Sequence, residues 1–140
     1  MNMNNRNITI TAADRDELKA VITFSGKVSD RAGVEFASLE NELKRAKVVA
    51  PDDLPPDVIS MNSSAELIDL DTKERMKFTL VFPRDANVEE EKISVLAPLG
   101  TAMLGYRVGD EFEWTVPDGL RRLKVTAVRF QPEAALARAA

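Results

Sequence analysis

Side chains able to do chemistry are scarce in this chain of 140 residues, which contains no histidine and no cysteine. The chain therefore lacks the commonest general base, the imidazole and thiolate ligands of most zinc sites, and any disulfide. Catalysis or metal binding would have to rest on carboxylates, lysines and hydroxyls. Enzymes that need a Ser-His-Asp triad and proteins built on a Cys/His zinc centre are excluded.

Two groups of acidic residues are candidates for a cation site. Glu89, Glu90 and Glu91 are adjacent in sequence, so their side chains point in different directions on any regular backbone and converge poorly on one ion. We expect a solvated loop there. Asp14 and Glu17 have a spacing that places two carboxylates on one helix face. Capping of a first helical turn explains the same pair, so we expect no metal or cofactor site.

Glycines 100, 105 and 109 superficially resemble a phosphate-binding loop. Their spacing fits neither the dinucleotide pattern nor the P-loop, and the Gly-Lys-Ser/Thr ending of the P-loop is missing. Turn geometry is therefore the better explanation of these glycines.

Three aromatic residues offer another candidate site. Phe112, Trp114 and Phe130 could line a ligand pocket like that of the FK506-binding (FKBP) prolyl isomerases. They occupy strand positions that alternate inward, however, and core packing is the expected role of such residues. A prolyl isomerase stays an alternative hypothesis, and we predict no enzymatic activity and no catalytic residue.

Composition indicates a cytoplasmic protein of about one domain. Hydrophobic residues make up 44% of the chain and charged residues 30%, and no stretch approaches the roughly 20 apolar residues of a membrane span. The formal net charge of −4 argues against affinity for naked nucleic acid, and we expect no direct sequence-specific binding to nucleic acid. Two basic clusters (Lys44, Arg45 and Lys47; Arg121, Arg122 and Lys124) are interpreted as solvated faces, with docking on an acidic partner as the alternative.

The first third of the chain has helical periodicity. Thr11 is a candidate N-cap for a helix that starts at about Ala12, and Gly26 is expected to end it. A second helix is expected after a cap at Ser29 or Asp30. Two short helices must hide their apolar stripes against each other, so we predict an antiparallel hairpin over residues 12–48.

A proline-rich connector follows the helical part, and the period then changes to that of strands. The prolines at 51, 55 and 56 disfavour helix, so we divide the chain into residues 1–50 and 51–140. Strand patterns cover Met76 to Phe82 and Glu111 to Val116, and a return strand shifts phase near Val128, which indicates a bulge. Between them Pro98 and Gly105 are expected to start and end a short helix. The predicted fold class is α+β: a helical hairpin followed by an antiparallel sheet wrapped on one short helix.

The segments Val58–Ser63, Ile93–Gly105 and Arg107–Trp114 resemble the C-terminal domain of the Gre transcription elongation factors. Their shared features are a strand, an Ala-Pro-Leu-Gly-x-Ala-x-Leu-Gly helix and a Val-Gly-Asp turn. The chain length, the short hairpin and the Gln-Pro-Glu ending at 131–133 are most similar to the Rnk subgroup, regulators of nucleoside diphosphate kinase. The resemblance implies an FKBP-like domain that binds RNA polymerase near its secondary channel.

The resemblance implies a comparison with the Gre factors, which stimulate transcript cleavage with two acids at the tip of a long coiled coil. This sequence departs from that pattern. Each expected helix has roughly 15 residues, or about 22 Å. The tip, Ser25 to Gly33, contains one acid, Asp30. We therefore predict that the chain does not stimulate cleavage. We also predict that it competes with longer channel-entering factors. Asp30 would either contact polymerase or cap the second helix.

If polymerase is the partner, we expect the contact around Pro98 to Asp110. An eight-residue amphipathic helix cannot bury all its apolar side chains, which makes Leu99, Met103 and Tyr106 the candidate contact residues. The alternative is that Leu99 and Met103 face the core and Tyr106 merely covers it. Direct binding to nucleoside diphosphate kinase is a further alternative function.

Overall fold

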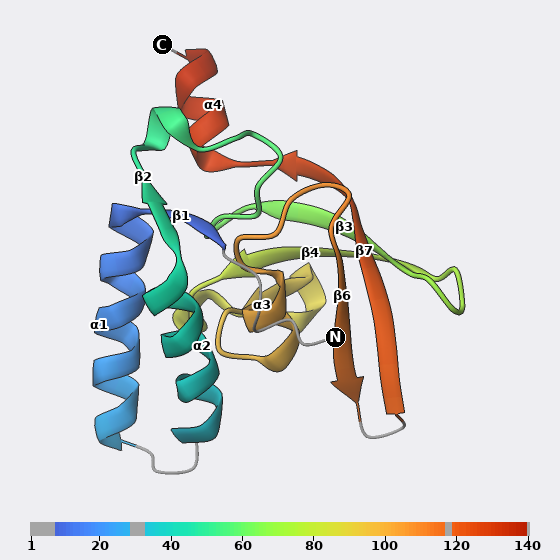
Figure 1. Ribbon diagram of the computed structural model, residues 1–140, viewed down its shortest axis with the longest axis horizontal. Coiled ribbons are helices and arrows are strands. Elements are labelled where there is room, and N and C mark those ends of the chain that lie inside the picture. The colour runs from blue at the N-terminus through green and yellow to red at the C-terminus, as the bar shows by residue number, and fades with distance from the viewer. Residues whose placement is uncertain (1–7, 29–32, 117–118, 140) are drawn as a thin grey trace.

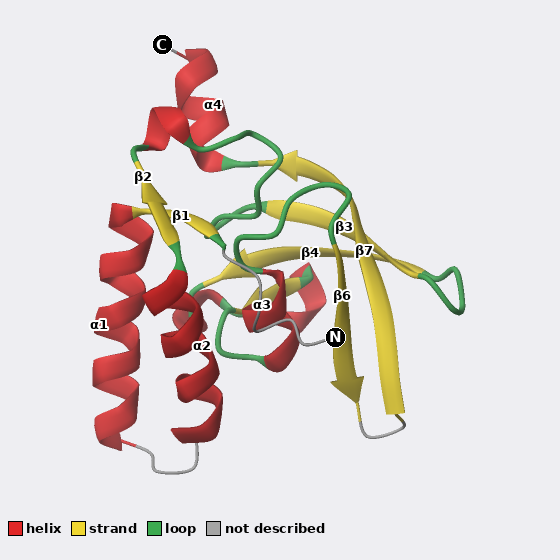
Figure 2. Cartoon of the chain, viewed as in Figure 1, coloured by secondary structure: helices red, strands yellow, loops and turns green. Residues whose placement is uncertain are grey.

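The computed structural model describes residues 8–28, 33–116 and 119–139, with the backbone alone for 24–28, 33–38, 98, 114–116 and 136–139. Figure 1 labels the elements along the chain and Figure 2 separates helices from strands. In chain order they are β1 (Thr9–Thr11), α1 (Ala12–Val28), α2 (Gly33–Arg45), β2 (Lys47–Val49), η3 (Pro51–Asp53), β3 (Ser64–Asp69), β4 (Arg75–Val81), η4 (Pro83–Asp85), η5 (Val88–Glu90), β5 (Lys92–Ser94), α3 (Pro98–Met103), β6 (Glu111–Val116), β7 (Gly119–Phe130) and α4 (Pro132–Ala139).

The helices α1 and α2 lie side by side at one end of the molecule (Figure 1). The N-cap prediction is confirmed, because the Thr11 hydroxyl oxygen accepts the Asp14 backbone N–H at 3.2 Å. Gly26 does not end α1, which runs on to Val28. A mid-helix glycine costs only about 1 kcal/mol, and such a cost does not stop a helix by itself. Strands β1 and β2 pair in parallel where the helical part begins and ends.

The main sheet has five strands in the order β5-β4-β3-β7-β6. The α+β class is confirmed, but the sheet is mixed and not antiparallel throughout, since β5 pairs with β4 in parallel. The connection through η4 and η5 brings the chain back so that β5 runs in the same direction beside the last three residues of β4, Thr79 to Val81. The FKBP-like description remains a prediction.

The bulge predicted in the last strand is confirmed. The pairing of β3 with β7 shifts register twice, between Ser64 and Ala65 and again between Glu66 and Leu67. Each shift leaves one residue of β7 without a partner opposite it, and the strand bends. This change of phase turns Phe130 outward, where its side chain is 48% exposed.

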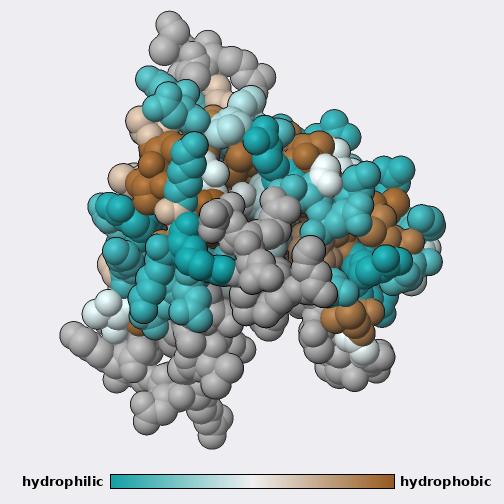
Figure 3. All heavy atoms as spheres, in the orientation of Figure 1, coloured by the Kyte–Doolittle hydropathy of each residue, from teal (hydrophilic) through white to brown (hydrophobic). Residues whose placement is uncertain are grey.

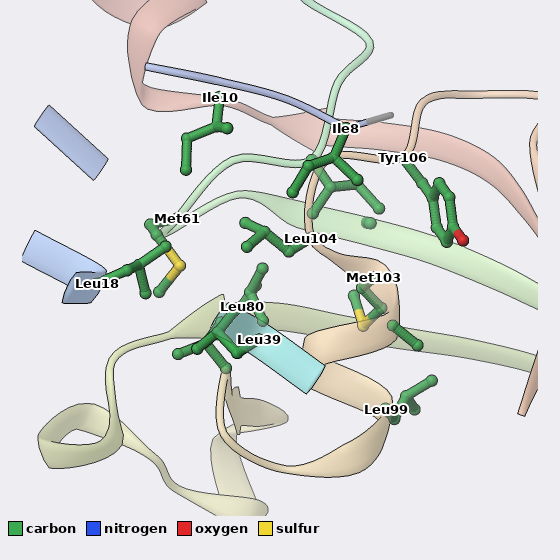
Figure 4. Packing of buried hydrophobic residues seen from close by; sticks show 14 of the residues in the cluster. Ile8, Ile10, Leu18, Leu39, Met61, Leu80, Leu99, Met103, Leu104 and Tyr106 are labelled. Atoms are coloured by element: carbon green, nitrogen blue, oxygen red, sulfur yellow. The ribbon is translucent and has the colours of Figure 1, made fainter. Parts of the chain in front are cut away.

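One hydrophobic core joins the helical part to the sheet. It contains Leu18 of α1 and Leu39 of α2 together with Leu80 of β4 and Leu123 of β7, all fully buried. Figure 4 shows side chains from helix, strand and α3 meeting in this core. The proposed division into residues 1–50 and 51–140 remains a prediction, although the two parts share this buried interior.

The short helix α3 starts at Pro98 and is followed by Gly105, as predicted. Gly105 has a φ of +81°, a left-handed conformation that favours glycine, and a Cβ there would lie 2.3 Å from Cβ of Ile8. Gly100 has a different reason, because a Cβ on it would lie 2.0 Å from the carbonyl oxygen of Ser94. The turn interpretation holds for Gly105 and for Gly109, with φ of +96°, but Gly100 allows close packing of α3.

The outer surface is mainly polar. On the face drawn in Figure 3, hydrophilic side chains cover much of the described surface and apolar ones form patches between them. None of the described helices has the length and apolar character needed to cross a membrane.

Candidate docking surface around α3

The turn after α3 is held by the extended segment 55–60, which leads into the sheet. Ile59 donates its backbone N–H to the Tyr106 carbonyl at 2.8 Å, and Gly105 donates to the Ile59 carbonyl at 2.8 Å. Val58 forms a bridge with Arg107, and Val108 donates to the Asp57 carbonyl at 3.1 Å. These bonds fix residues 105–108 as firmly as a strand pair would.

A charged clamp reinforces the turn. The Arg107 guanidinium donates to both carboxylate oxygens of Asp57 at 3.1 to 3.3 Å, a bidentate geometry that defines the orientation of both groups. The Asp110 carboxylate accepts the Arg107 backbone N–H at 2.9 Å, and the Asp110 carbonyl accepts from Val125 of β7 at 2.9 Å. The turn is thus attached both to the connector and to the sheet.

The structure places the predicted contact residues inside the molecule. Leu99 is 3% exposed, Met103 0% and Tyr106 3%, so the expectation that they remain at the surface is wrong. A six-residue helix enclosed by the sheet and α2 has no free side, and Figure 4 shows the three side chains among other core residues. Burial of these three side chains does not test whether the region Pro98 to Asp110 contacts a partner, and that contact stays a prediction.

The exposed apolar side chain of the turn belongs to Val108, which is 40% exposed between Arg107 and Gly109. Sequence reasoning included Val108 in the turn but did not single it out. The signal was the turn itself: a side chain at the apex of a Val-Gly-Asp turn projects away from the sheet. Asp57, the partner of Arg107, was also missed because the two residues are 50 positions apart.

Asp30, the fourth predicted contact residue, lies outside the described residues, and so does the expected cap of the second helix. Other predicted features are placed. The run Glu89, Glu90 and Glu91 is exposed, the Glu89 and Glu90 N–H groups bond to the Asn87 side chain, and Glu90 forms an ion pair with Lys92 at 2.9 Å. Over the described part of the chain, no group of three or more His, Cys, Asp or Glu side chains could hold a metal ion.

Asp14 and Glu17 take separate partners and do not face a common ion. The Asp14 carboxylate accepts the backbone N–H of Met61 at 3.2 Å, whereas Glu17 pairs with Arg84 at 3.3 Å. Burial raises the pKa of Asp14 to about 6, and the nearby carboxylates of Glu133 and Glu17 add to that rise, against the lowering effect of the Met61 hydrogen bond. Asp14 therefore lies in the first turn of α1 and also contacts the segment that leads into the sheet.

The aromatic residues divide between core and surface. Phe112 is 5% exposed and stacks on Tyr106, with ring centroids 5.1 Å apart, which confirms core packing for this residue. Phe130 is half-exposed, so core packing is wrong for it. The side chain of Trp114 lies outside the described residues.

The basic clusters are partly paired. Arg121 bonds to Asp69 at 3.1 Å and Arg122 to Asp71 at 3.1 Å, so two of the three cations on β7 stabilise the turn after β3. Arg45 pairs with Glu42 at 3.0 Å within α2. Part of each cluster is therefore engaged in local ion pairs, and the interpretation of the clusters as solvated faces remains a prediction.

The last helix, α4, was not predicted. Its start is tied to the segment 55–60: the Gln131 amide nitrogen donates to the carbonyls of Pro55 and Val58, each at 2.7 Å, and the Ser60 hydroxyl donates to Glu133 at 2.7 Å. Pro132 at the first helical position and Glu133 in the first turn were the signals available in the sequence.

The turn after α3, exposed at Arg107 to Gly109 and tied to a mixed sheet, lies in a region that matches a known protein family. A family model described as the C-terminal region of the transcription elongation factors GreA/GreB matches residues 54–130. The chain belongs to this family, and the resemblance inferred from the sequence is confirmed.

Individual relatives refine this placement. The chain is 41% identical over 106 residues to the regulator of nucleoside diphosphate kinase of Escherichia coli K12, covering 74% of this chain and 78% of that protein. It is 39% identical over 103 residues to transcription elongation factor GreA of Clostridium acetobutylicum, covering 72% of this chain and 65% of that one.

Solved structures agree with the sequence relatives. A GreA/GreB elongation factor from Nitrosomonas europaea superposes with a TM-score of 0.73 at 36% identity, covering 90% of this chain and all of that one. Gfh1 of Thermus aquaticus matches with a TM-score of 0.51 at 28% identity over 89% of this chain. The relatives are elongation factors and a regulator by name, which agrees with a non-enzymatic role.

Proposed function

We propose that this chain is a non-enzymatic transcription regulator that binds RNA polymerase near its secondary channel. The family match over residues 54–130 carries the proposal, since it includes α3, the turn after it and the sheet that supports both. The names of the relatives, elongation factors and a regulator, support the same class of function.

In this proposal the docking surface is the exposed apex of the turn Arg107–Asp110. Val108 supplies apolar contact area, and the Asp57–Arg107 clamp keeps the apex in one conformation before binding. Leu99, Met103 and Tyr106 support the turn from inside, so their substitution would act through the fold. Preorganisation of this kind lowers the entropy cost of association.

The helical part supports docking without stimulation of transcript cleavage. α1 has 17 residues and α2 has 13, so α1 spans about 26 Å and α2 about 20 Å at 1.5 Å per residue. Much of that length packs against the sheet through Leu18 and Leu39. The sequence between the helices offers the single acid Asp30, whereas metal-assisted cleavage by Gre factors uses a pair. We infer that the chain occupies the polymerase site and competes with longer factors.

Binding to core RNA polymerase tests the proposal directly. The purified chain should co-elute with polymerase and displace a Gre factor, without increasing cleavage of a backtracked transcript. Val108→Asp should raise the Kd by about tenfold, because it places a charge at the centre of the contact. Val88→Asp is the matched control, since Val88 is 93% exposed on η5 and belongs to no docking element. Absence of both co-elution and displacement would refute polymerase binding, and equal effects of the two variants would refute the docking site.

Asp30 allows a second test at the other end of the chain. If Asp30 contacts the rim of the channel, Asp30→Ala should weaken polymerase binding more than it lowers the free energy of unfolding. If the residue only caps α2, the variant should lose about 1 kcal/mol of stability and keep its affinity. Thermal unfolding and a polymerase titration on the same samples separate these outcomes.

A direct effect on nucleoside diphosphate kinase is the second candidate function, favoured by the name of the 41% identical relative. The assay is a pull-down of the purified kinase on this chain, with the Val108→Asp variant in parallel. Stoichiometric kinase binding would support direct regulation, and an effect on kinase expression with no binding would support regulation through transcription.

A further inference from the structure

Two carboxylates from opposite ends of the chain meet beside the segment 55–60. Asp14, in the first turn of α1, accepts the Met61 N–H at 3.2 Å. Glu133, in the first turn of α4, accepts the Ser60 hydroxyl at 2.7 Å. Ser60 and Met61 are adjacent, and both are almost fully buried. The two acids are therefore held on neighbouring residues of one buried segment, and Glu133 contributes to the raised pKa of Asp14.

The charged groups around Asp14 are acids. Glu133 of α4 and Glu17 of α1 both oppose its ionisation. Residues 59–63 bring hydroxyls and a backbone N–H but no ionisable side chain. Arg84 of η4 is 3.3 Å from Glu17 and partly neutralises that carboxylate, so Glu133 is the acid without a cation among the contacts described. Ionisation of both Asp14 and Glu133 places two like charges in a partly buried site.

α4 has few other attachments to the rest of the molecule. Its contacts fall mainly on η3, and its start is held by Gln131 on the carbonyls of Pro55 and Val58 and by Glu133 on Ser60. An eight-residue helix at the end of a chain has little stability of its own. Modest repulsion at its first turn is therefore enough to change how often it detaches.

We propose that Asp14 and Glu133 form a charge-sensitive latch, in which ionisation of Asp14 beside the Glu133 carboxylate favours release of α4 from the segment 55–60 and a neutral Asp14 favours the attached state. Attachment opposes the ionisation of Asp14, so by linkage the ionisation of Asp14 opposes attachment. The burial that raises the pKa of Asp14 to about 6 places this transition near neutral pH.

The latch and the candidate docking turn share the segment 55–60. The same short segment bonds to α4 through Val58 and Ser60 and to the turn through Asp57 and Ile59. Release of α4 with Gln131 would remove three hydrogen bonds from this segment. A consequence for docking, which rests on the proposed polymerase function, is that the turn is better ordered, and binds more tightly, when the latch is closed.

Hydrogen exchange of the full-length chain tests the latch without polymerase. Amide protection in a C-terminal peptide covering residues 131–139 is measured by mass spectrometry for the wild type and Asp14→Asn, which keeps an acceptor for the Met61 N–H. At pH 7.5 the variant should be protected severalfold more, because its side chain carries no charge beside Glu133. At pH 5 the two proteins should match. Comparison at equal pH cancels the intrinsic exchange rate.

Controls decide between the latch and a general effect of charge. Asp16→Asn makes the same chemical change on an exposed carboxylate of α1 and should behave as the wild type at both pH values. In a Glu133→Gln background, which retains an acceptor for Ser60, Asp14→Asn should have a smaller effect on protection at pH 7.5. Equal protection of wild type and Asp14→Asn at pH 7.5 would overturn the latch, as would a difference that persists unchanged at pH 5.

A polymerase titration at pH 6 and pH 7.5 then tests the coupling. If the latch regulates docking, the wild type should lose affinity at the higher pH by a larger factor than Asp14→Asn does. Equal losses overturn the coupling. Exchange results as expected, with no polymerase binding by any protein, would support the latch and refute the proposed function.

Discussion

Replacing Gly105 by alanine should destabilise the protein through two separable effects. The residue has a φ of +81°, and a left-handed backbone costs a residue with a Cβ about 1–2 kcal/mol. The new Cβ would also lie 2.3 Å from Cβ and 2.9 Å from Cγ2 of Ile8, a contact that real structures do not tolerate. Ile8 is 2% exposed, so its displacement disturbs a packed site at a further cost of about 1–3 kcal/mol. The expected total is about 2–5 kcal/mol.

Gly109→Ala separates the two contributions. Gly109 has a φ of +96°, but a Cβ there meets no atom within 4 Å, so this variant should lose only the backbone cost of about 1–2 kcal/mol. Any gain from a less flexible unfolded chain is common to both variants and cancels in their difference. That difference, about 1–3 kcal/mol, reports the collision with Ile8.

Urea unfolding followed by fluorescence of the single tryptophan gives the free energies. A double-mutant cycle adds the decisive comparison, because Ile8→Ala shortens the side chain that would collide. Gly105→Ala should cost less in the Ile8→Ala background than in the wild type. Equal losses for Gly105→Ala and Gly109→Ala, together with additivity in the cycle, would refute the packing of the N-terminal strand on this turn.

Three further outcomes follow from buried polar groups. Gln131→Leu should lower the free energy of unfolding by about 1–3 kcal/mol, since it removes two hydrogen bonds and takes the side-chain donor away from the Val58 carbonyl, whereas the Pro55 carbonyl keeps the Val58 N–H; urea unfolding checks it, and a loss below about 0.5 kcal/mol contradicts it. Asp69 has a pKa held below 3.8, chiefly by the Thr72 backbone N–H, so its stabilising effect is present above that pH and is lost on acidification. Asp69→Asn should therefore weaken the acid dependence of thermal unfolding below pH 4, and an unchanged acid limb would contradict this. The pKa of Asp14 is raised, which reverses the sign: Asp14→Asn should be stabilising at pH 7.5, by about 1–2 kcal/mol, and neutral below pH 4. Thermal unfolding that shows no pH-dependent difference would contradict it.

The sequence correctly predicts those features whose geometry is determined by residues close by in the chain. The Thr11 cap, the Pro98 start and the Gly105 conformation follow from backbone chemistry within a few residues, and all three agree with the structure. The apolar face of α1 was likewise correct, with Leu18 and Ile22 buried. Periodicity identifies a buried face because it needs only the geometry of one helix.

Features that depend on distant pairing could not be read in the same way. β5 lies parallel to β4 because of how the connection through η4 and η5 returns, and a three-residue strand carries no signal for direction. Phe130 faces outward because two register shifts precede it, although a single phase shift was visible in the sequence. α4 was hidden by its shortness, and its main partners, Pro55, Val58 and Ser60, lie more than 70 residues away.

The candidate site shows why residue type alone identified the wrong contact residues. Leu99, Met103 and Tyr106 form an apolar stripe that is equally suited to a partner and to a core, and sequence cannot choose between them. Enclosure by the sheet and α2 decides for the core. Within the described turn after α3, the exposed apolar side chain is that of Val108. The backbone of this turn is hydrogen-bonded to Asp57 and Ile59 and to Val125 of β7.

In the proposed complex the apolar contact area at Val108 is small. Affinity therefore depends more on the fixed conformation of the turn than on the area buried. The turn is fixed by Asp57 and Ile59, residues of the segment that leads into β3. A change at either residue therefore acts on the conformation of the proposed docking turn. A variant such as Asp57→Asn, which weakens the clamp while leaving Val108 in place, should therefore reduce both polymerase affinity and competition with a longer factor, with little change in the core.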